Sequence, residues 1–129
     1  MKIYCAGKFQ DSERVIHIAN ILKTNGHFIT AEWWIAENQL NPIEVPFYDF
    51  NGVKAADILI VLLDKNLPYF GTLMEIGFAL ALGKPVYIIG TDPFSVTPLF
   101  NHPLIFPIEY FKDTESTTEI IKYLNYKVA

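Results

Sequence analysis

The segment with the clearest chemical potential is a Gly-Thr-x-x-Glu-x-Gly block at residues 71–77. Thr72 and Glu75 have the spacing of a capping box, in which two side chains satisfy free backbone donors at a helix start. Glu75 is also the only ionisable residue between Gly71 and Leu82, in an otherwise apolar stretch. A carboxylate kept anionic there by the helix dipole could attack the electron-poor anomeric carbon of a sugar. From the block alone, both the cap and the nucleophile remain open.

A second carboxylate lies upstream, where Asp49 stands between Tyr48 and Phe50. An aspartate between aromatic side chains could have a raised pKa and donate a proton as a general acid. The alternative is a loop aspartate that starts a short helix. A third carboxylate, Asp64, directly follows a buried apolar run and could contact a ligand or form a turn.

The residue types give little support for a metal site or a dinucleotide-binding site. His17, His27 and His102 lack the spacing of metal ligands, and Cys5 is the only cysteine, so we expect no metal site. The loop after the first apolar run has Gly7 but not the further glycines of a dinucleotide-binding fingerprint.

Several aromatic residues precede or flank the second carboxylate. Their rings could stack on a planar base, although packing in the core is the ordinary role of such residues. The residues concerned are Trp33, Trp34, Phe47 and Tyr48.

Composition limits the class of protein. The chain has 129 residues, 51% of them hydrophobic, which suffices for one domain spanning residues 1–129. Fourteen acidic residues against ten basic ones give a net charge of −4, which disfavours binding to nucleic acid polymers. Apolar runs are too short to cross a membrane, and the first residues resemble a strand more than a signal peptide. We therefore expect a cytoplasmic protein with no membrane partner.

Hydrophobic periodicity then predicts the elements that must position these side chains. Apolar runs alternate with helical patterns, which indicates an α/β fold with a mostly parallel five-stranded sheet and helices on both faces. Ligands of such folds bind at the carboxyl ends of the strands. The expected strands are 2–6, 27–34, 57–64, 86–89 and 104–108, the last at an edge because of Pro107. The first expected helix begins at Asp11 or Ser12 and stops at Asn25-Gly26. Further helices are expected at 49–56, 71–82 and 113–126, and residues 35–47 should form a loop with a short helix.

These residues together resemble a known family. Tyr4-Cys5-Ala6-Gly7, Ala56-Asp57 before a buried strand, the block from Gly71 to Ala79 and the following Gly83-Lys84-Pro85-Val86 are similar to nucleoside 2-deoxyribosyltransferases. The likeness runs in order from the N-terminus to about residue 112, and the Gly-Thr-x-x-Glu-x-Gly-x-Ala block is its most specific part.

The resemblance implies a three-layer, flavodoxin-like (Rossmann-like) fold without a metal or organic cofactor. It also implies transfer of 2-deoxyribose between nucleobases through a covalent deoxyribosyl–glutamate intermediate. Glu75 matches the family nucleophile, and Asp49, eight residues before Asp57, matches the aspartate that helps to protonate the leaving base. Relatives complete their pocket with a neighbouring subunit, so a homo-oligomer is expected. The substrate-binding residues that we expect are Tyr4, Gly7, Lys8, Tyr48, Asp64, Gly71, Thr72 and Asn101.

The sequence departs from the family pattern before the Gly-Thr pair, where Tyr69 and Phe70 replace an acidic or amide residue. Asp64 or Asn66 could then hold the sugar hydroxyl. Related 2'-deoxynucleoside 5'-monophosphate N-glycosidases share the two carboxylates but use serines for the phosphate, and this chain has no serine between Ser12 and Ser95. Because Lys8 and Arg14 could serve a phosphate instead, hydrolysis of a deoxynucleotide remains the alternative. A non-catalytic nucleotide-binding or signalling module is the third hypothesis.

Overall fold

A parallel sheet organises the part of the chain that the computed structural model describes, residues 1–36, 38–63, 70–90, 98–109 and 113–128. Within these residues it has five strands in the order β2-β1-β3-β4-β5, and every adjacent pair is parallel. The strands are β1 (Lys2–Ala6), β2 (Phe28–Ile29), β3 (Ile58–Leu63), β4 (Val86–Gly90) and β5 (Ile105–Glu109). The helices are α1 (Ser12–Thr24), α2 (Trp33–Ala36), α3 (Glu44–Ala55), α4 (Phe70–Ala81) and α5 (Asp113–Val128), with 3-10 turns at Phe9–Asp11 and Pro98–Asn101.

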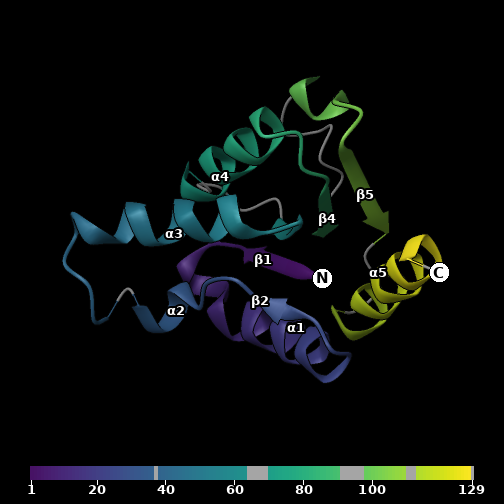
Figure 1. Cartoon of the computed structure of the whole chain (residues 1–129), viewed down its shortest axis with the longest axis horizontal. Coiled ribbons are helices and arrows are strands. Elements are labelled where there is room, and N and C mark those ends of the chain that lie inside the picture. Colours follow the sequence, from purple (N-terminus) through teal and green to yellow (C-terminus); the bar gives the residue numbers. More distant parts are fainter. Residues whose placement is uncertain (37, 64–69, 91–97, 110–112, 129) are drawn as a thin grey trace.

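Helices cover both faces of the sheet, with α1 and α5 packed together on one face and α3 and α4 on the other (Figure 1). All six residues of β3 are buried, as the unbroken apolar run predicted for a strand covered on both faces. The strand order is that of doubly wound, flavodoxin-like folds. The predicted fold class is therefore confirmed, and the sheet is wholly rather than mostly parallel.

The second predicted strand, 27–34, is wrong in its extent. Only Phe28 and Ile29 form β2, and the chain enters α2 at Trp33. The indole of Trp33 turns inward, where it is 4% exposed and its Nε1 donates a hydrogen bond to the Cys5 carbonyl at 2.8 Å. An apolar run thus ends in a helix because one large ring finds a buried acceptor in the neighbouring strand.

Helix α3 begins five residues earlier than the predicted start at Asp49. The Asn41 side-chain oxygen accepts hydrogen bonds from the backbone N–H groups of Ile43 and Glu44, both at 3.0 Å, which satisfies free donors at this helix start. Pro46 lies in the first turn, where a missing N–H costs nothing. The proline that suggested a loop is therefore compatible with the helix.

Helix α4 is almost wholly apolar in sequence, but it is not buried on all sides. Phe70 and Met74 are 76% and 62% exposed, while Ile76 and Ala79 face the sheet. The predicted edge position of the strand with Pro107 is confirmed, because β5 pairs only with β4. Among the described helices, none combines the length and the hydropathy that crossing a membrane requires.

Candidate active site

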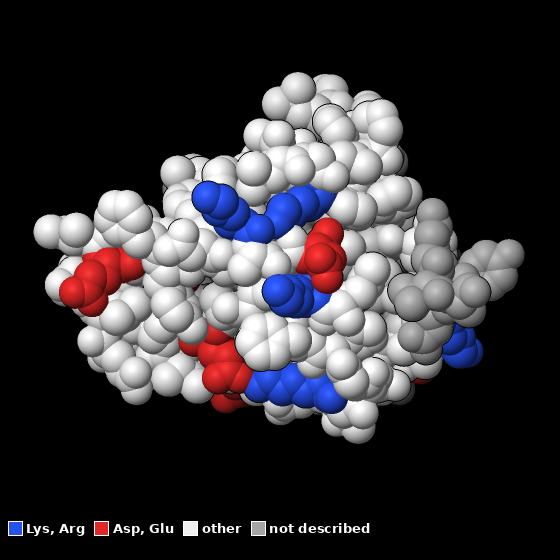
Figure 2. Space-filling model, in the orientation of Figure 1, with Lys and Arg blue, Asp and Glu red and all other residues white. Residues whose placement is uncertain are grey.

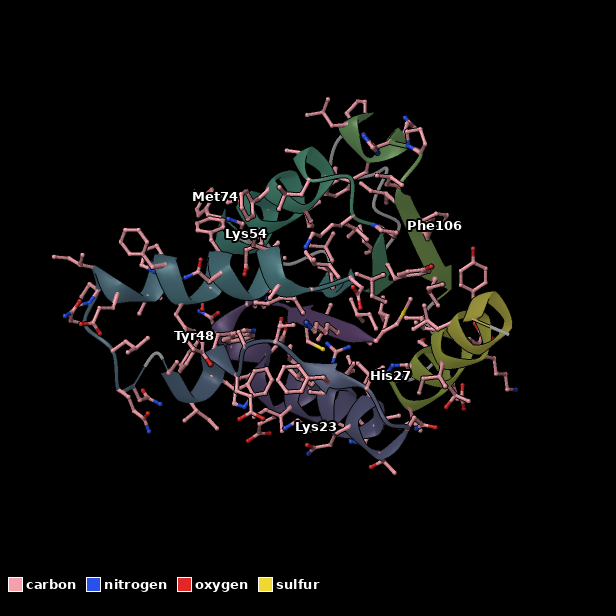
Figure 3. All side chains as sticks on the ribbon, viewed as in Figure 1. Lys23, His27, Tyr48, Lys54, Met74 and Phe106 are labelled. Carbon is pink, nitrogen blue, oxygen red and sulfur yellow. The ribbon has the colours of Figure 1, made fainter. Side chains whose placement is uncertain are left out.

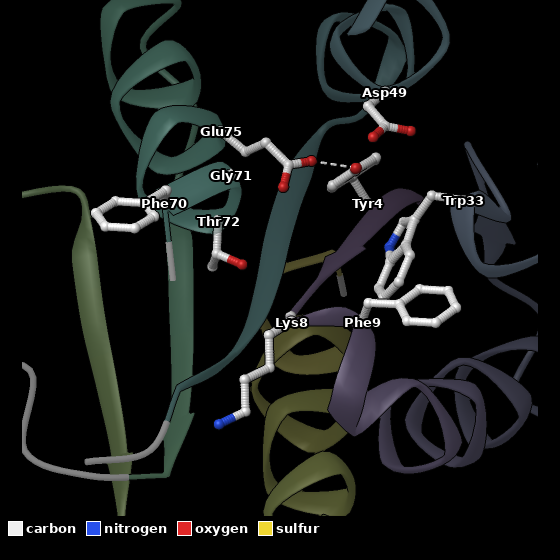
Figure 4. A pocket seen from close by; sticks show the side chains of 10 residues that line it. Tyr4, Lys8, Phe9, Trp33, Asp49, Phe70, Gly71, Thr72 and Glu75 are labelled. Carbon is white, nitrogen blue, oxygen red and sulfur yellow. Dashed lines mark hydrogen bonds between the residues drawn. The ribbon is translucent and has the colours of Figure 1, made fainter. Parts of the chain in front are cut away.

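A cavity of about 260 Å³ opens at the carboxyl end of the sheet, beside the ends of β1 and α4 (Figure 4). The chain leaves β1 toward β2 and leaves β3 toward β4, in opposite directions, so this is the switch point at which doubly wound folds bind ligands. Its walls come from β1, the loop after it, α2, α3 and α4. The lining residues are Tyr4, Gly7, Lys8, Phe9, Trp33, Asp49, Phe70, Gly71, Thr72 and Glu75.

Glu75 lies on α4 with its side chain 9% exposed, and its Oε2 accepts a hydrogen bond from the hydroxyl of Tyr4 on β1. Because α4 starts at Phe70, Thr72 is the third helical residue and Glu75 lies in the second turn, so the predicted capping box is wrong. The carboxylate is held by a side chain from the sheet and turned toward the cavity.

Tyr4 is fully buried, and its pKa is raised well above that of an ordinary tyrosine. Burial is the largest cause, followed by the nearby charges of Glu75 and then Asp49, since each of these disfavours a phenolate. The hydroxyl therefore stays protonated and remains a donor to Glu75. Asp49 and Glu75 line the same cavity as Tyr4, so the structure brings the two predicted catalytic residues together around this phenol (Figure 4).

Asp49 reaches the cavity because α3 packs unusually close to β1. A Cβ atom on Gly52, one turn after Asp49, would lie 2.6 Å from the Ala31 Cβ and 3.0 Å from the Tyr4 ring, so only glycine fits. The Thr30 hydroxyl donates to the Gly52 carbonyl at 2.7 Å and fastens the same point of the helix. Gly52 thus allows the approach that places Asp49 beside the tyrosine.

The loop after β1 contributes the opposite wall. At Gly7 a Cβ would lie 2.7 Å from the Val15 side chain, so the absence of a side chain lets the loop fold against α1. Lys8 lines the cavity, and its ammonium, which points away from Glu75 and Asp49 in Figure 4, lies 3.9 Å from the Asp11 carboxylate. Gly71 and Thr72 complete the α4 side, with Thr72 3% exposed.

The other expected substrate-binding residues stand apart from this cavity in the described structure. Tyr48, on α3, points toward the segment between β2 and α2, where its hydroxyl accepts a hydrogen bond from the Glu32 N–H at 3.0 Å (Figure 3). Asn101 is exposed in a 3-10 turn and donates to the Pro98 carbonyl. Asp64, like Asn66 and Tyr69, lies outside the described residues.

Two aromatic rings of the cavity were missed by the sequence reasoning. Phe9 and Phe70 are 50% and 76% exposed, an unusual setting for phenylalanine. Each directly flanks a predicted site segment, which is the signal that could have identified them. Of the rings considered earlier, Trp33 lines the cavity, whereas Trp34 packs edge-on against Trp33 at 5.4 Å and Phe47 is exposed.

The distribution of charge and the types of side chain in the cavity limit the kinds of ligand that the protein can bind. Basic and acidic residues are interspersed on the face shown in Figure 2, without the continuous basic stripe of a nucleic-acid surface. Within the described ranges, no three His, Cys, Asp or Glu side chains gather where they could hold a metal ion. The described lining of the cavity includes two carboxyl groups, a phenol, a lysine and three further aromatic residues, which suits a small polar ligand with a planar ring.

Comparison with known families decides the classification. The family model for nucleoside 2-deoxyribosyltransferases matches residues 3–105, most of the chain. This chain belongs to that family. No curated protein matches it by sequence.

Solved structures agree with the family assignment at the level of the fold. A CMP N-glycosidase from Clostridium botulinum is similar with a TM-score of 0.74 and 21% identity, covering 95% of this chain and 99% of that one. A 2-deoxyribosyltransferase from Bacillus psychrosaccharolyticus has a TM-score of 0.63 and 24% identity, covering 91% and 90%. A 2-deoxyribosyltransferase from Leishmania mexicana has a TM-score of 0.56 and 22% identity, covering 70% and 65%. The fold is thus shared with structures described as a CMP N-glycosidase and as 2-deoxyribosyltransferases.

Proposed function

We propose that this protein transfers 2-deoxyribose between nucleobases, with Glu75 as the nucleophile and Asp49 as the proton donor. The observation that supports this most directly is the buried Glu75 carboxylate, oriented by the Tyr4 hydroxyl in a cavity that Asp49 also lines. A carboxylate already fixed in one orientation loses little freedom when it attacks, so more of the binding energy can lower the barrier.

The reaction would proceed in two displacements. An oxygen of Glu75 attacks C1' of a 2'-deoxynucleoside, and the C1'–N bond breaks while the departing base takes a proton from the carboxylic acid of Asp49. A nitrogen of the incoming base then attacks C1', the bond to Glu75 breaks, and the proton lost by that base returns to Asp49. Two inversions at C1' retain the configuration of the sugar.

The aromatic residues supply a place for the base. Phe9 and Trp33 lie together on one side of the cavity, and Phe70 lies on the α4 side (Figure 4). A planar base can stack on such rings, while the backbone at Gly71, where an added Cβ would meet no heavy atom within 4 Å, leaves room for the sugar. Thr72 offers a hydroxyl at the same wall.

Hydrolysis of a nucleoside 5'-monophosphate is the second candidate. The presence of Lys8 among the lining residues favours it, since a lysine can pair with a phosphate. The similar structure of a CMP N-glycosidase favours it as well. In that case water replaces the second base in the second displacement, and the products are a free base and a sugar phosphate.

One product analysis separates these functions. The protein is incubated with deoxyinosine and adenine, and separately with deoxynucleosides and their 5'-monophosphates alone. Transfer predicts deoxyadenosine and hypoxanthine, whereas the hydrolase predicts base release from the monophosphates only. Binding by calorimetry without any product would identify a non-catalytic module and overturn the proposal.

We also propose that a second copy of the chain covers the mouth of the cavity. Apolar side chains on α3 and α4 are exposed beside it. Phe47 is 68% exposed, and Met74, which is labelled in Figure 3, is 62% exposed. Exposed apolar patches of this kind mark interaction surfaces, and a self-complementary patch forms a symmetric dimer. Sedimentation should show a dimer or larger oligomer that Met74→Glu dissociates, and a wild-type monomer at micromolar concentration would contradict this.

A further inference from the structure

A lysine far from the cavity joins the two helices that carry the proposed catalytic carboxylates. Lys84 lies in the turn after α4, and its Nζ donates hydrogen bonds to the carbonyl oxygens of Val53, at 3.1 Å, Lys54 and Ala56. These carbonyls stand at the end of α3. The last carbonyls of a helix lack helical partners and carry the negative end of its dipole, so an ammonium group is a favourable cap.

The cap affects the arrangement of the site because each of the two helices carries one of the proposed catalytic carboxylates. Asp49 is on α3, and Glu75 is on α4. Between them, the rings of Phe50 and Phe78 pack edge-on with centroids 5.2 Å apart. Lys84 therefore closes the far end of the same helix pair whose near end holds the cavity.

The two carboxylates project from different helices. Glu75 projects from α4, and its carboxylate is held by the hydroxyl of Tyr4 on β1. Asp49 projects from α3, and this helix is fastened by Thr30 at Gly52 and by Lys84 at Val53, Lys54 and Ala56. Loosening the end of α3 should thus displace Asp49 more than Glu75.

We propose that Lys84 is a positioning residue, which ties the end of α3 to the turn after α4 and so holds Asp49 where it can protonate the departing base. This inference rests on the proposed function. Lys84 does not line the cavity, so it acts through Asp49 and does not contact the substrate.

A leaving group that needs no proton provides the test. Lys84→Met should lower kcat about tenfold or more for the nucleoside or nucleotide that the wild type cleaves, because general acid catalysis contributes about 10²–10⁴-fold. With the matching 4-nitrophenyl 2-deoxyriboside, which releases a stable phenolate, kcat should stay within about twofold of wild type. A merely structural loss would slow both substrates equally.

Matched variants test whether the loss of activity comes from removing the Lys84 cation at the end of α3. Lys84→Arg keeps a cation that can reach the carbonyls and should recover most of the activity on the natural substrate. Lys54→Met removes an exposed lysine from the same helix end while its backbone carbonyl remains available to Lys84, so it should behave as wild type. In the Asp49→Asn background, Lys84→Met should cause no further loss, since residues that act through one group are not additive.

The possible results distinguish a failure of this inference from a failure of the proposed function. Equal loss on both substrates, no loss on either, or full additivity with Asp49→Asn overturns the inference and leaves the proposed function intact. A wild-type protein that cleaves neither substrate overturns the proposed function, and the inference with it. If Lys84→Met fails to fold, Thr30→Val removes the neighbouring anchor of α3 and must show the same substrate-dependent loss.

Discussion

The hydroxyl of Tyr4 donates a hydrogen bond to Oε2 of Glu75, which joins the first strand to the fourth helix across 71 residues of sequence. The bond gives a buried carboxylate a fixed orientation and a polar partner, both of which burial otherwise makes costly. Tyr4, Glu75 and Asp49 line the same cavity, so the phenol of Tyr4 is part of the proposed catalytic site.

Removing this hydroxyl should weaken catalysis more than binding. A hydrogen bond to a charged group contributes about 1.5–3 kcal/mol, so Tyr4→Phe should lower kcat by about 10–100-fold with a smaller change in KM. Steady-state kinetics measure both constants. Tyr87→Phe, a buried tyrosine of β4 packed against Phe106, is the control and should keep wild-type rates.

Glu75→Gln should abolish turnover, since an amide oxygen is a poor nucleophile while the shape of the side chain is preserved. We expect a loss on the order of 10⁴-fold or more in kcat. Mass spectrometry of quenched wild-type protein should find a deoxyribosyl adduct on the peptide that contains Glu75. An active Glu75→Gln variant would exclude the covalent route.

Asp49→Asn should slow cleavage of natural substrates by about 10²–10⁴-fold, because the amide cannot supply the proton that the departing base needs. The loss should largely disappear with a 4-nitrophenyl leaving group. Comparing kcat for the two substrate types measures this directly. A similar loss on both would assign Asp49 to binding or structure.

Glycine substitutions should separate close packing from helix propensity. Gly52→Ala forces a Cβ against Ala31 and the Tyr4 ring, so it should destabilise the fold by about 1–3 kcal/mol and lower activity. Gly77→Ala, in an exposed interior position of α4 with no heavy atom within 4 Å of the added Cβ, should stabilise by about 0.5–1 kcal/mol. Urea unfolding gives both values, and the reverse order would contradict the packing argument.

The single cysteine should be inert in the folded protein. Burial raises the pKa of Cys5 to about 12, so at pH 8 the thiol stays neutral and the reactive thiolate is scarce. Iodoacetamide should label it slowly at pH 8 and rapidly after unfolding in urea, as mass spectrometry would show. Fast labelling of the native protein would mean that β1 opens readily.

Local sequence patterns were sufficient for the elements whose signal is short-ranged. The six-residue apolar run of β3 and the Asn25-Gly26 stop of α1 predicted those elements, because strand burial and helix termination depend on neighbouring residues. The extent of β2 was not predictable in this way. It depends on the Trp33 indole meeting the Cys5 carbonyl, a partner 28 residues away.

The candidate site likewise has some features that the sequence shows and others that only the tertiary structure shows. The sequence by itself determined that Glu75 is an isolated carboxylate on an apolar helix, and its resemblance to the family singled out Asp49, since residue type and spacing are visible in one dimension. Only the tertiary structure decided that Tyr4 holds Glu75, that Gly52 lets Asp49 approach, and that Lys84 caps α3. Such contacts join residues distant in the chain, and packing geometry, which no local pattern records, brings them together.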